Sequence, residues 1–202
     1  IHINESTFIK STLAATVSGL DMHTELMNQD NVLLPKNRIK NTNWNYIFTS
    51  SLNTKFNDFH TNKTGVQWTG LQYNMFMKYA RYSGDTPKII SDESGKSSLL
   101  SAFSSSMFHL SQRMDMTLGI TSQYFTLNHH YTIEPRVALK WELSKSQSLS
   151  FGYGMYSRLD KLNYYFAKSA NGELINKDLD FTKSHNLSLA YDASIGDSYH
   201  IK

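Results

Sequence analysis

Apolar and polar residues alternate along most of the chain. Between Leu149 and Met155 the odd positions hold Leu, Phe, Tyr and Met, and the positions between them hold Ser or Gly. A period of two predicts a β-strand with one apolar face and one small or polar face. Similar segments cover residues 9–17, 46–56, 71–79, 98–109, 116–124, 133–143 and 187–193, the fourth with a less regular alternation. We therefore predict eight strands, with a ninth beginning near Tyr199.

The connections between these segments fall into two groups. Residues 57–64, 111–115, 144–147 and 194–197 predict short turns, whereas residues 22–43, 81–96 and 159–180 predict long loops. A tight turn near Asn128–Tyr131 departs from this trend. Helical periodicity is not sustained in any segment. Short turns at one rim and long loops at the other are typical of an antiparallel up-and-down β-barrel of the outer-membrane type.

The two faces of these strands need different surroundings. Charged residues on the polar face, such as Lys55, Lys78 and Asp192, are costly to bury unpaired, so this face must meet water. The other face carries aliphatic residues in mid-strand and aromatic residues toward the strand ends. Trp and Tyr favour the membrane interface, so we predict interface positions for Trp44 and Tyr46 at the start of one strand, Trp68 near the start of another and Trp141 near the end of a third.

Strand length also favours a membrane. Several alternating runs cover about 12 to 15 residues, whereas strands of globular proteins usually have about 5 to 6 and a tilted transmembrane strand needs about 9 to 11. The alternative is a soluble antiparallel β-sandwich with one wet face. In a barrel, the polar face lines the lumen, and we predict that Arg136, Lys140, Glu142, Arg158 and Asp192 face it.

Composition limits the chemistry that the chain can perform. The 202 residues include no cysteine, which excludes disulfides and cysteine-based zinc sites, and a net charge of +3 is too small to indicate a nucleic-acid partner. His129 and His130 are adjacent, but neighbouring strand residues face opposite ways, so we do not expect the two imidazoles to share a metal ion. Gly95-Lys96-Ser97 lacks the upstream glycine of a phosphate-binding loop. We predict no catalytic residue, cofactor or metal, and hence no enzyme.

The second half of the chain resembles a known family. The resemblance rests on four sequence elements. These are Gly119, Gln123-Tyr124-Phe125 and Leu127, then Ile133-Glu134-Pro135-Arg136, then Leu149–Gly154 with Ser157, and finally Asn176–His185 leading into Leu187–Asp192. This set resembles the barrel region of TonB-dependent outer-membrane receptors of the Bacteroidota type. The likeness covers residues 116–192, and the earlier part matches only in style.

The resemblance implies a 22-stranded barrel closed around an N-terminal plug. At roughly 25 residues a strand, such a barrel needs on the order of 550 residues. We therefore expect residues 1–202 to be a partial outer-membrane β-barrel of about eight to nine strands, with the plug domain and the remaining strands outside this chain. A complete eight-stranded barrel of structural or adhesive type is the alternative.

The family likeness also implies a function and partners. The expected activity is active transport of a scarce solute, such as a siderophore, corrinoid, glycan or peptide, across the bacterial outer membrane. Its partners would be the lipid bilayer, TonB through the N-terminal part that is missing here, and a lid lipoprotein of the kind found on some of these barrels. Nothing in the strands identifies the solute. If the sandwich alternative holds, the chain is instead a soluble binding module.

Overall fold

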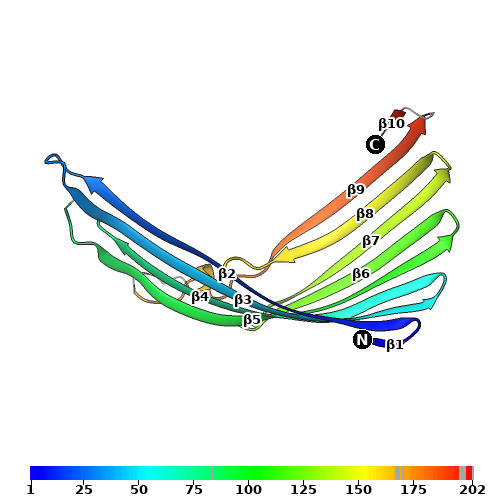
Figure 1. The fold of residues 1–202 in the computed structure, drawn as a ribbon, viewed down its shortest axis with the longest axis horizontal. Coiled ribbons are helices and arrows are strands. Elements are labelled where there is room, and N and C mark those ends of the chain that lie inside the picture. Colours follow the sequence, from blue (N-terminus) through cyan, green and yellow to red (C-terminus); the bar gives the residue numbers. More distant parts are fainter. Residues whose placement is uncertain (83, 167–168, 170, 196–198, 202) are drawn as a thin grey trace.

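The chain forms a single curved antiparallel sheet in the computed structural model (Figure 1). The structure describes residues 1–82, 84–166, 169, 171–195 and 199–201. The strands are β1 (His2–Asn4), β2 (Thr7–Met27), β3 (Leu33–Asn57), β4 (His60–Tyr79), β5 (Lys88–Ser111), β6 (Met114–Phe125), β7 (Tyr131–Ser144), β8 (Gln147–Arg158), β9 (Thr182–Ile195) and β10 (Tyr199–Ile201). One short helix, α1 (Leu162–Tyr165), lies between β8 and β9.

The strand order follows the chain from β1 to β10, and each strand pairs antiparallel with the next. This confirms the predicted up-and-down meander, and each of the eight predicted segments lies within a strand. Residues 58–59, 112–113 and 145–146 form short turns at one end of the sheet, which we call the turn rim. Residues 28–32, 80–87, 126–130 and 159–181 connect strands at the opposite end, the loop rim.

Two of the predicted long loops were wrong, because strands occupy most of residues 22–43 and 81–96. The β2–β3 connection is only residues 28–32, where Asn28 Oδ1 accepts the backbone N–H groups of Asp30 and Val32 and Asn31 has a φ of 58°. Extended pairing continues to this end although apolar and polar residues no longer alternate regularly between the two faces, so the alternation disappears but the ladder does not. Trp44 and Trp68 therefore lie within β3 and β4 rather than near their starts.

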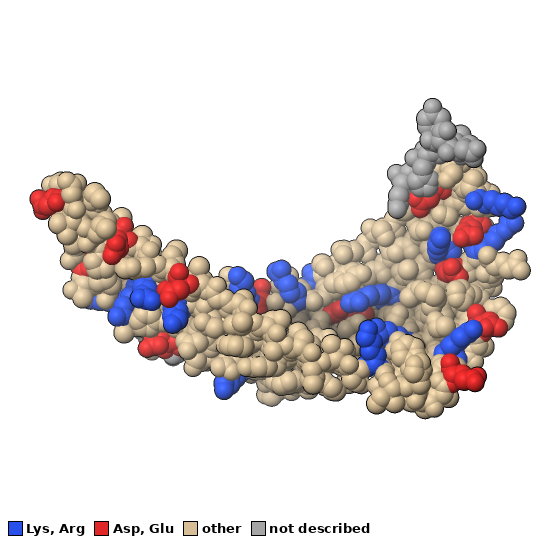
Figure 2. Space-filling model, in the orientation of Figure 1, with Lys and Arg blue, Asp and Glu red and all other residues tan. Residues whose placement is uncertain are grey.

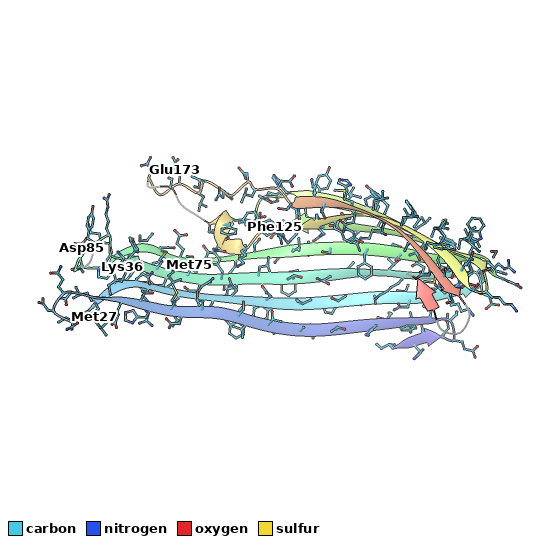
Figure 3. All side chains as sticks on the ribbon, turned by 90° about the horizontal axis from the view of Figure 1, so that it is seen from above. Met27, Lys36, Met75, Asp85, Phe125 and Glu173 are labelled. Atoms are coloured by element: carbon cyan, nitrogen blue, oxygen red, sulfur yellow. The ribbon has the colours of Figure 1, made fainter. Side chains whose placement is uncertain are left out.

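The sheet has a hollow side, on which α1 lies, and an outer side; we call these the concave and convex faces (Figures 1 and 3). The convex face carries aliphatic side chains that are largely exposed, including Leu13 at 81% and Leu187 at 74%. Others on this face are Val17, Val66, Leu118, Ile120, Ile133 and Leu189. A soluble domain would bury such a surface, so the convex face requires apolar surroundings.

Toward the loop rim of β4, the apolar residues lie on the opposite face from the one predicted. Register places Trp68 and Lys78 on the convex face, whereas Leu71, Tyr73 and Met75 lie on the concave face with Gln67. The prediction that Lys78 shares the wet, lumen-side face was therefore wrong. Beyond Trp68 the convex face becomes polar and the concave face apolar.

The buried core lies on the concave face near the loop rim. Tyr73, Phe125, Leu162, Tyr165 and Phe181 form one cluster, in which residues 159–166 and Phe181 pack against β4–β6. Figure 3 shows α1 between the labelled Met75 and Phe125. Among the described residues no helix has the length and apolar character needed to cross a membrane.

Gly95 makes room for this core. A Cβ atom at this position would lie 2.4 Å from the Tyr73 ring and 2.6 Å from the Phe166 ring. Gly95-Lys96-Ser97 is part of β5, so its glycine serves close packing rather than phosphate binding.

Candidate functional site

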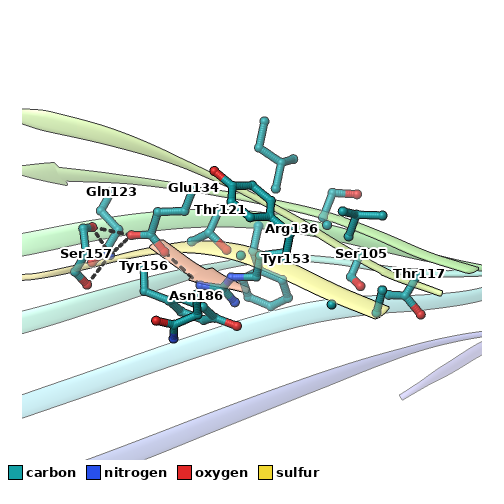
Figure 4. Close-up of a pocket in the computed structure, with 18 of the residues that line it drawn as sticks. Ser105, Thr117, Thr121, Gln123, Glu134, Arg136, Tyr153, Tyr156, Ser157 and Asn186 are labelled. Atoms are coloured by element: carbon teal, nitrogen blue, oxygen red, sulfur yellow. Dashed lines mark hydrogen bonds and ion pairs between the residues drawn. The ribbon is translucent and has the colours of Figure 1, made fainter. Parts of the chain in front are cut away.

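A depression of the concave face with many polar side chains lies over β4–β9. It is a cavity of about 630 Å³ whose lining is rich in hydroxyl and amide groups (Figure 4). Its polar lining residues include Gln67, Ser101, Ser105, Thr117, Thr121, Gln123, Glu134, Arg136, Tyr156, Ser157, Asn186 and Ser188. Such a surface offers many hydrogen-bonding groups to a polar solute.

Glu134 is the centre of a hydrogen-bond network in this cavity. Its carboxylate accepts hydrogen bonds from Gln123 Nε2 at 2.5 Å, from Ser157 Oγ, and from Arg136 Nη2 at 2.8 Å (Figure 4). Glu134 is only 1% exposed, so the charge of its carboxylate needs these donors.

The Glu134 network spans the place where two strands separate. The β7–β8 ladder ends at the pair Arg136–Gly154, and Pro135 has no N–H group to extend it. Glu134 on β7 and Ser157 on β8 lie beyond that point, and Gln123 reaches both from β6. The side chains thus connect three strands where backbone pairing stops.

Arg136 is held on two sides. One side is the Glu134 carboxylate, and the other is the Tyr156 ring, whose centroid lies 4.5 Å from the guanidinium carbon. Gly154 is needed beneath that ring, because a Cβ atom there would lie 2.8 Å from Tyr156. The arrangement fixes the direction of the Arg136 side chain, which is still 41% exposed to the cavity.

The five predicted lumen-facing residues do not form one site. Register places Arg136, Lys140 and Glu142 on the concave face of β7, but only Arg136 lines the large cavity. Lys140 and Glu142 lie 3.7 Å apart and share a smaller depression at the turn rim with Asp192. Arg158 ends β8 at the opposite rim. That the concave face lines a lumen stays a prediction.

Glu134, Gln123 and Ser157 were not selected as site residues from the sequence. All three belong to the short sequence elements that carry the family resemblance, and this was the one available signal. Their contact depends on the pairing register of β6–β8, which alternation within one strand does not reveal.

Residues 177–180 are attached to the β6–β7 connection. Asn128 Nδ2 donates to the backbone carbonyls of Lys177 at 3.2 Å and Leu179 at 2.8 Å. His130 Nδ1 lies 3.5 Å from Asp180 Oδ1, while His129 Nδ1 lies 2.6 Å from the Tyr124 hydroxyl. The two adjacent histidines therefore have separate partners.

Asp180 gives this attachment a pH dependence. The backbone N–H of Phe181, and then the Lys183 and His130 side chains, hold the pKa of Asp180 below its usual value of 3.8. The stabilisation that the ionised Asp180 carboxylate provides is therefore complete above about pH 4, and it is lost as pH falls through the lowered pKa. A fluorescent probe at Glu173 should report loosening of the Asp180–His130 contact only in that acidic range. An acidic step of unchanged size in Asp180→Asn would contradict this origin.

The predicted interface aromatics all lie on the convex face by register. Trp44 and Tyr46 stack with ring centroids 6.2 Å apart, and Trp68 pairs with Phe48 on the neighbouring strand. Trp141 is near the turn rim, where it pairs with Leu149. Trp44, Tyr46 and Trp68 thus lie near the middle of β3 and β4, where Trp68 is level with Tyr124 near the loop-rim end of β6, and Trp141 lies toward the turn rim.

Comparison with known proteins identifies the fold. No protein-family model matches this sequence, and no curated protein sequence matches it either. The fold is similar to the ferric enterobactin receptor PfeA (G324V mutant) of Pseudomonas aeruginosa, with a TM-score of 0.71 and 13% identity over 95% of this chain and 31% of that chain. It is also similar to the copper transporter OprC, with a TM-score of 0.68 and 11% identity over 95% of this chain and 34% of that one.

A third similar structure is the siderophore receptor PirA of Pseudomonas aeruginosa, with a TM-score of 0.61 and 11% identity over 98% of this chain and 42% of that chain. The chain thus spans between about a third and two-fifths of the length of these proteins. The sheet matches the barrel portion of TonB-dependent receptors, and at these identities the likeness concerns the fold.

Proposed function

We propose that this chain forms part of the wall of a TonB-dependent outer-membrane receptor that imports a scarce solute. The carrying observation is the meander with an exposed apolar convex face and a polar concave cavity. Residues 1–202 would be a partial barrel, completed by further strands and filled by a plug domain. TonB would supply the energy through that plug.

The convex aromatics support a placement in the bilayer. On β7, Tyr131 and Trp141 lie on the same face and are ten residues apart, which corresponds to about 33 Å along the strand. At a tilt near 45° this distance spans about 23 Å across the membrane, close to the ~25 Å apolar band of such barrels. Ile133, Val137 and Leu139 lie between the two aromatics on the same face. The loop rim would be extracellular, because the longer connections of such barrels lie on that side.

The concave cavity supports a polar solute. Its hydroxyl and amide groups, together with Arg136, suit a ligand with many oxygen atoms. The similar solved structures are named for ferric enterobactin, a siderophore and copper, so an iron chelate is our first candidate. A corrinoid, a glycan or a peptide would use the same surface, and for a glycan or peptide a lid lipoprotein could cover the loop rim.

Uptake measurements test this function. Cells lacking the protein should lose import of one labelled solute from a panel of ferric siderophores, corrinoids and oligosaccharides. That import should also stop when TonB is removed, because transport across this membrane has no local energy source. Import of the whole panel at the wild-type rate in the deleted strain would refute the proposal.

Narrowing the cavity should slow this import. Thr121 lines the cavity from β6, and Thr121→Trp should lower the uptake rate by about tenfold by filling part of the solute path. The matched control is Leu118→Trp, on the convex face of the same strand, which should leave the rate unchanged. Equal rates for the two variants, at equal amounts of protein in the membrane, would contradict a path along the concave face.

A further inference from the structure

Charged and uncharged side chains separate onto opposite faces of β2–β4 near the loop rim. Every Asp, Glu, Lys and Arg of residues 18–24, 37–45 and 71–79 lies on the convex face by register, and these are Asp21, Arg38, Lys40 and Lys78. The concave face of the same segments is therefore uncharged. It forms the hollow side of the left arm of the sheet in Figure 2 and extends to β5, where Glu93 pairs by register with Met75.

Four asparagine side chains follow β3 along the middle of this uncharged surface. Asn37, Asn41, Asn43 and Asn45, which we call the amide row, share the concave face with Ile39, and all four are half-buried. Successive positions on one face of a strand are two residues, or about 6.7 Å, apart. The amide row thus presents a hydrogen-bonding group at nearly every such position.

Two members of the amide row have an unused hydrogen-bond acceptor. The Oδ1 atoms of Asn37 and Asn41 are shielded from water and have no hydrogen-bond partner among the described residues. The amide of Asn45 has a weak partner, because its Nδ2 atom lies 3.4 Å from Thr16 Oγ1. The terminal torsion of an Asn side chain is soft, so a small rotation turns such an oxygen toward the surface. A donor from another molecule would then satisfy it.

Apolar side chains flank the amide row on both neighbouring strands. Asn41 pairs by register with Leu20 on β2 and with Met75 on β4. Two residues nearer the loop rim, Met22 and Met77 hold the corresponding positions. Leu20 is 53% exposed and Met22 is 37% exposed, so the β2 side is open. On the β4 side, Met75 packs against the buried cluster, which borders the surface.

An extended peptide chain matches this arrangement. In such a chain the N–H and C=O groups of every second residue point to the same edge, at the spacing of the amide row. Its side chains point alternately to the two sides of that edge, where the apolar residues of β2 and β4 lie. An Asn side chain has one carbonyl acceptor and one NH₂ donor group, and therefore complements both groups of a peptide residue. A charged side chain would lose water here without gaining a partner.

We propose that the amide row binds an extended, uncharged peptide chain that lies along the concave face of β3. Asn41, Asn43 and Asn45 bond to alternate residues of the peptide, whose side chains lie over Leu20 on one side and Met75 on the other. The inference rests on the proposed function, because the peptide is the imported solute or the peptide part of an imported iron chelate. Both sources offer the same backbone amides.

Affinity selection tests the amide row. The full-length protein in detergent micelles is incubated with a mixture of acetylated and amidated hexapeptides of aliphatic and hydroxyl-bearing residues, and retained peptides are identified by mass spectrometry. The wild type should retain some of these peptides. Methylation of the backbone nitrogens at every second residue should weaken binding about tenfold in one phase of the alternation and leave it unchanged in the other, because only one edge meets the row.

Three further probes distinguish the sources and the rivals. They are ferric complexes of hydroxamate-bearing members of the same mixture, ferric citrate, which has no peptide backbone, and cellohexaose. Retention of the free peptides assigns the row to peptides as solutes, whereas retention of the ferric peptides alone assigns it to the peptide part of a chelate. Retention of only ferric citrate or cellohexaose, or of no probe, would overturn the proposal.

Two double variants at the same height on the strands separate the amide row from the strands that carry it. Asn41→Leu with Asn43→Leu keeps the side-chain size on the concave face and should weaken binding of a retained peptide about tenfold. Thr42→Leu with Asn74→Leu changes a register pair on the convex face and should bind that peptide as the wild type does. Equal affinities of the two double variants would contradict recognition by the amide row.

The two proposals fail separately. TonB-dependent import of a labelled solute by intact cells, together with no retained peptide, refutes the amide row alone. If the purified protein retains peptides but its deletion leaves import of the solute panel and of those peptides unchanged, the transport function is refuted and the binding surface stands.

Discussion

Phe125→Ala should release residues 159–166 from the concave face while the strands stay paired. Phe125 is 0% exposed and meets the Tyr165 ring edge-on, with centroids 5.0 Å apart. Tyr73, Leu162 and Phe181 complete the cluster, so truncation opens a cavity at its centre. Removing a buried Phe side chain costs about 3–5 kcal/mol. The continuous ladders of β2–β6 do not depend on this cluster, so the loss should be local.

Hydrogen–deuterium exchange measures this release. In Phe125→Ala the amides of residues 162–166 and 181 should exchange faster, whereas those in the middle of β4–β6 should be unaffected. The matched control is Tyr131→Ala on the convex face, where the residue is 68% exposed and lies outside the buried cluster. Faster exchange throughout the sheet in Phe125→Ala would show that the cluster holds the barrel wall rather than the loop.

Alternation predicted the strands correctly wherever the two faces meet different solvents. In 133–143 and 149–155 one face is apolar and the other polar, and β7 and β8 cover both segments. The strand over residues 33–43 was not predicted because polar residues lie on both of its faces there, with Lys36, Arg38 and Lys40 among asparagines. In the proposed membrane placement, the bilayer accounts for the alternation, and where a strand projects beyond the bilayer the alternation is lost although the hydrogen bonds continue.

The inverted face of β4 illustrates a second limit. Leu71, Tyr73 and Met75 alternate as regularly as any lipid-facing run, so the sequence alone assigns them to the convex side. They pack instead against residues 159–166 and Phe181, about ninety residues later in the chain, on the concave face near the loop rim. Only the tertiary fold of that connection shows which face is buried.

The candidate site was predictable only in part, because alternation assigns a face to a residue but does not reveal its partners on other strands. Parity within β7 correctly puts Arg136 with Lys140 and Glu142 on one face. Glu134 shares that parity, but its importance comes from Gln123 and Ser157, which reach it across the gap beyond the last β7–β8 pair. A contact made where a ladder ends depends on strand register and divergence, and neither follows from local residue patterns.

Glu134→Ala should destabilise the wall by about 3 kcal/mol. Breaking one partner of a buried ion pair costs about 3–5 kcal/mol, and the partly exposed Arg136 places the loss near the lower end. The variant also leaves Gln123 and Ser157 without their shared acceptor at the junction of β6, β7 and β8. The midpoint of urea unfolding of the full-length protein in detergent micelles should fall accordingly, with β8 losing protection first.

Two companion variants separate the charge from the position. Glu142→Ala removes a carboxylate from the same face of the same strand, but Glu142 is 53% exposed and lies 3.7 Å from Lys140. An exposed pair of this kind contributes about 0–1 kcal/mol, so the unfolding midpoint should barely move. Glu134→Gln keeps an oxygen acceptor but not the charge, and should fall between the two because the Arg136 guanidinium loses its counter-ion. If Glu134→Ala and Glu142→Ala lowered the midpoint equally, the Glu134 network would have no special part in holding β7 and β8 together.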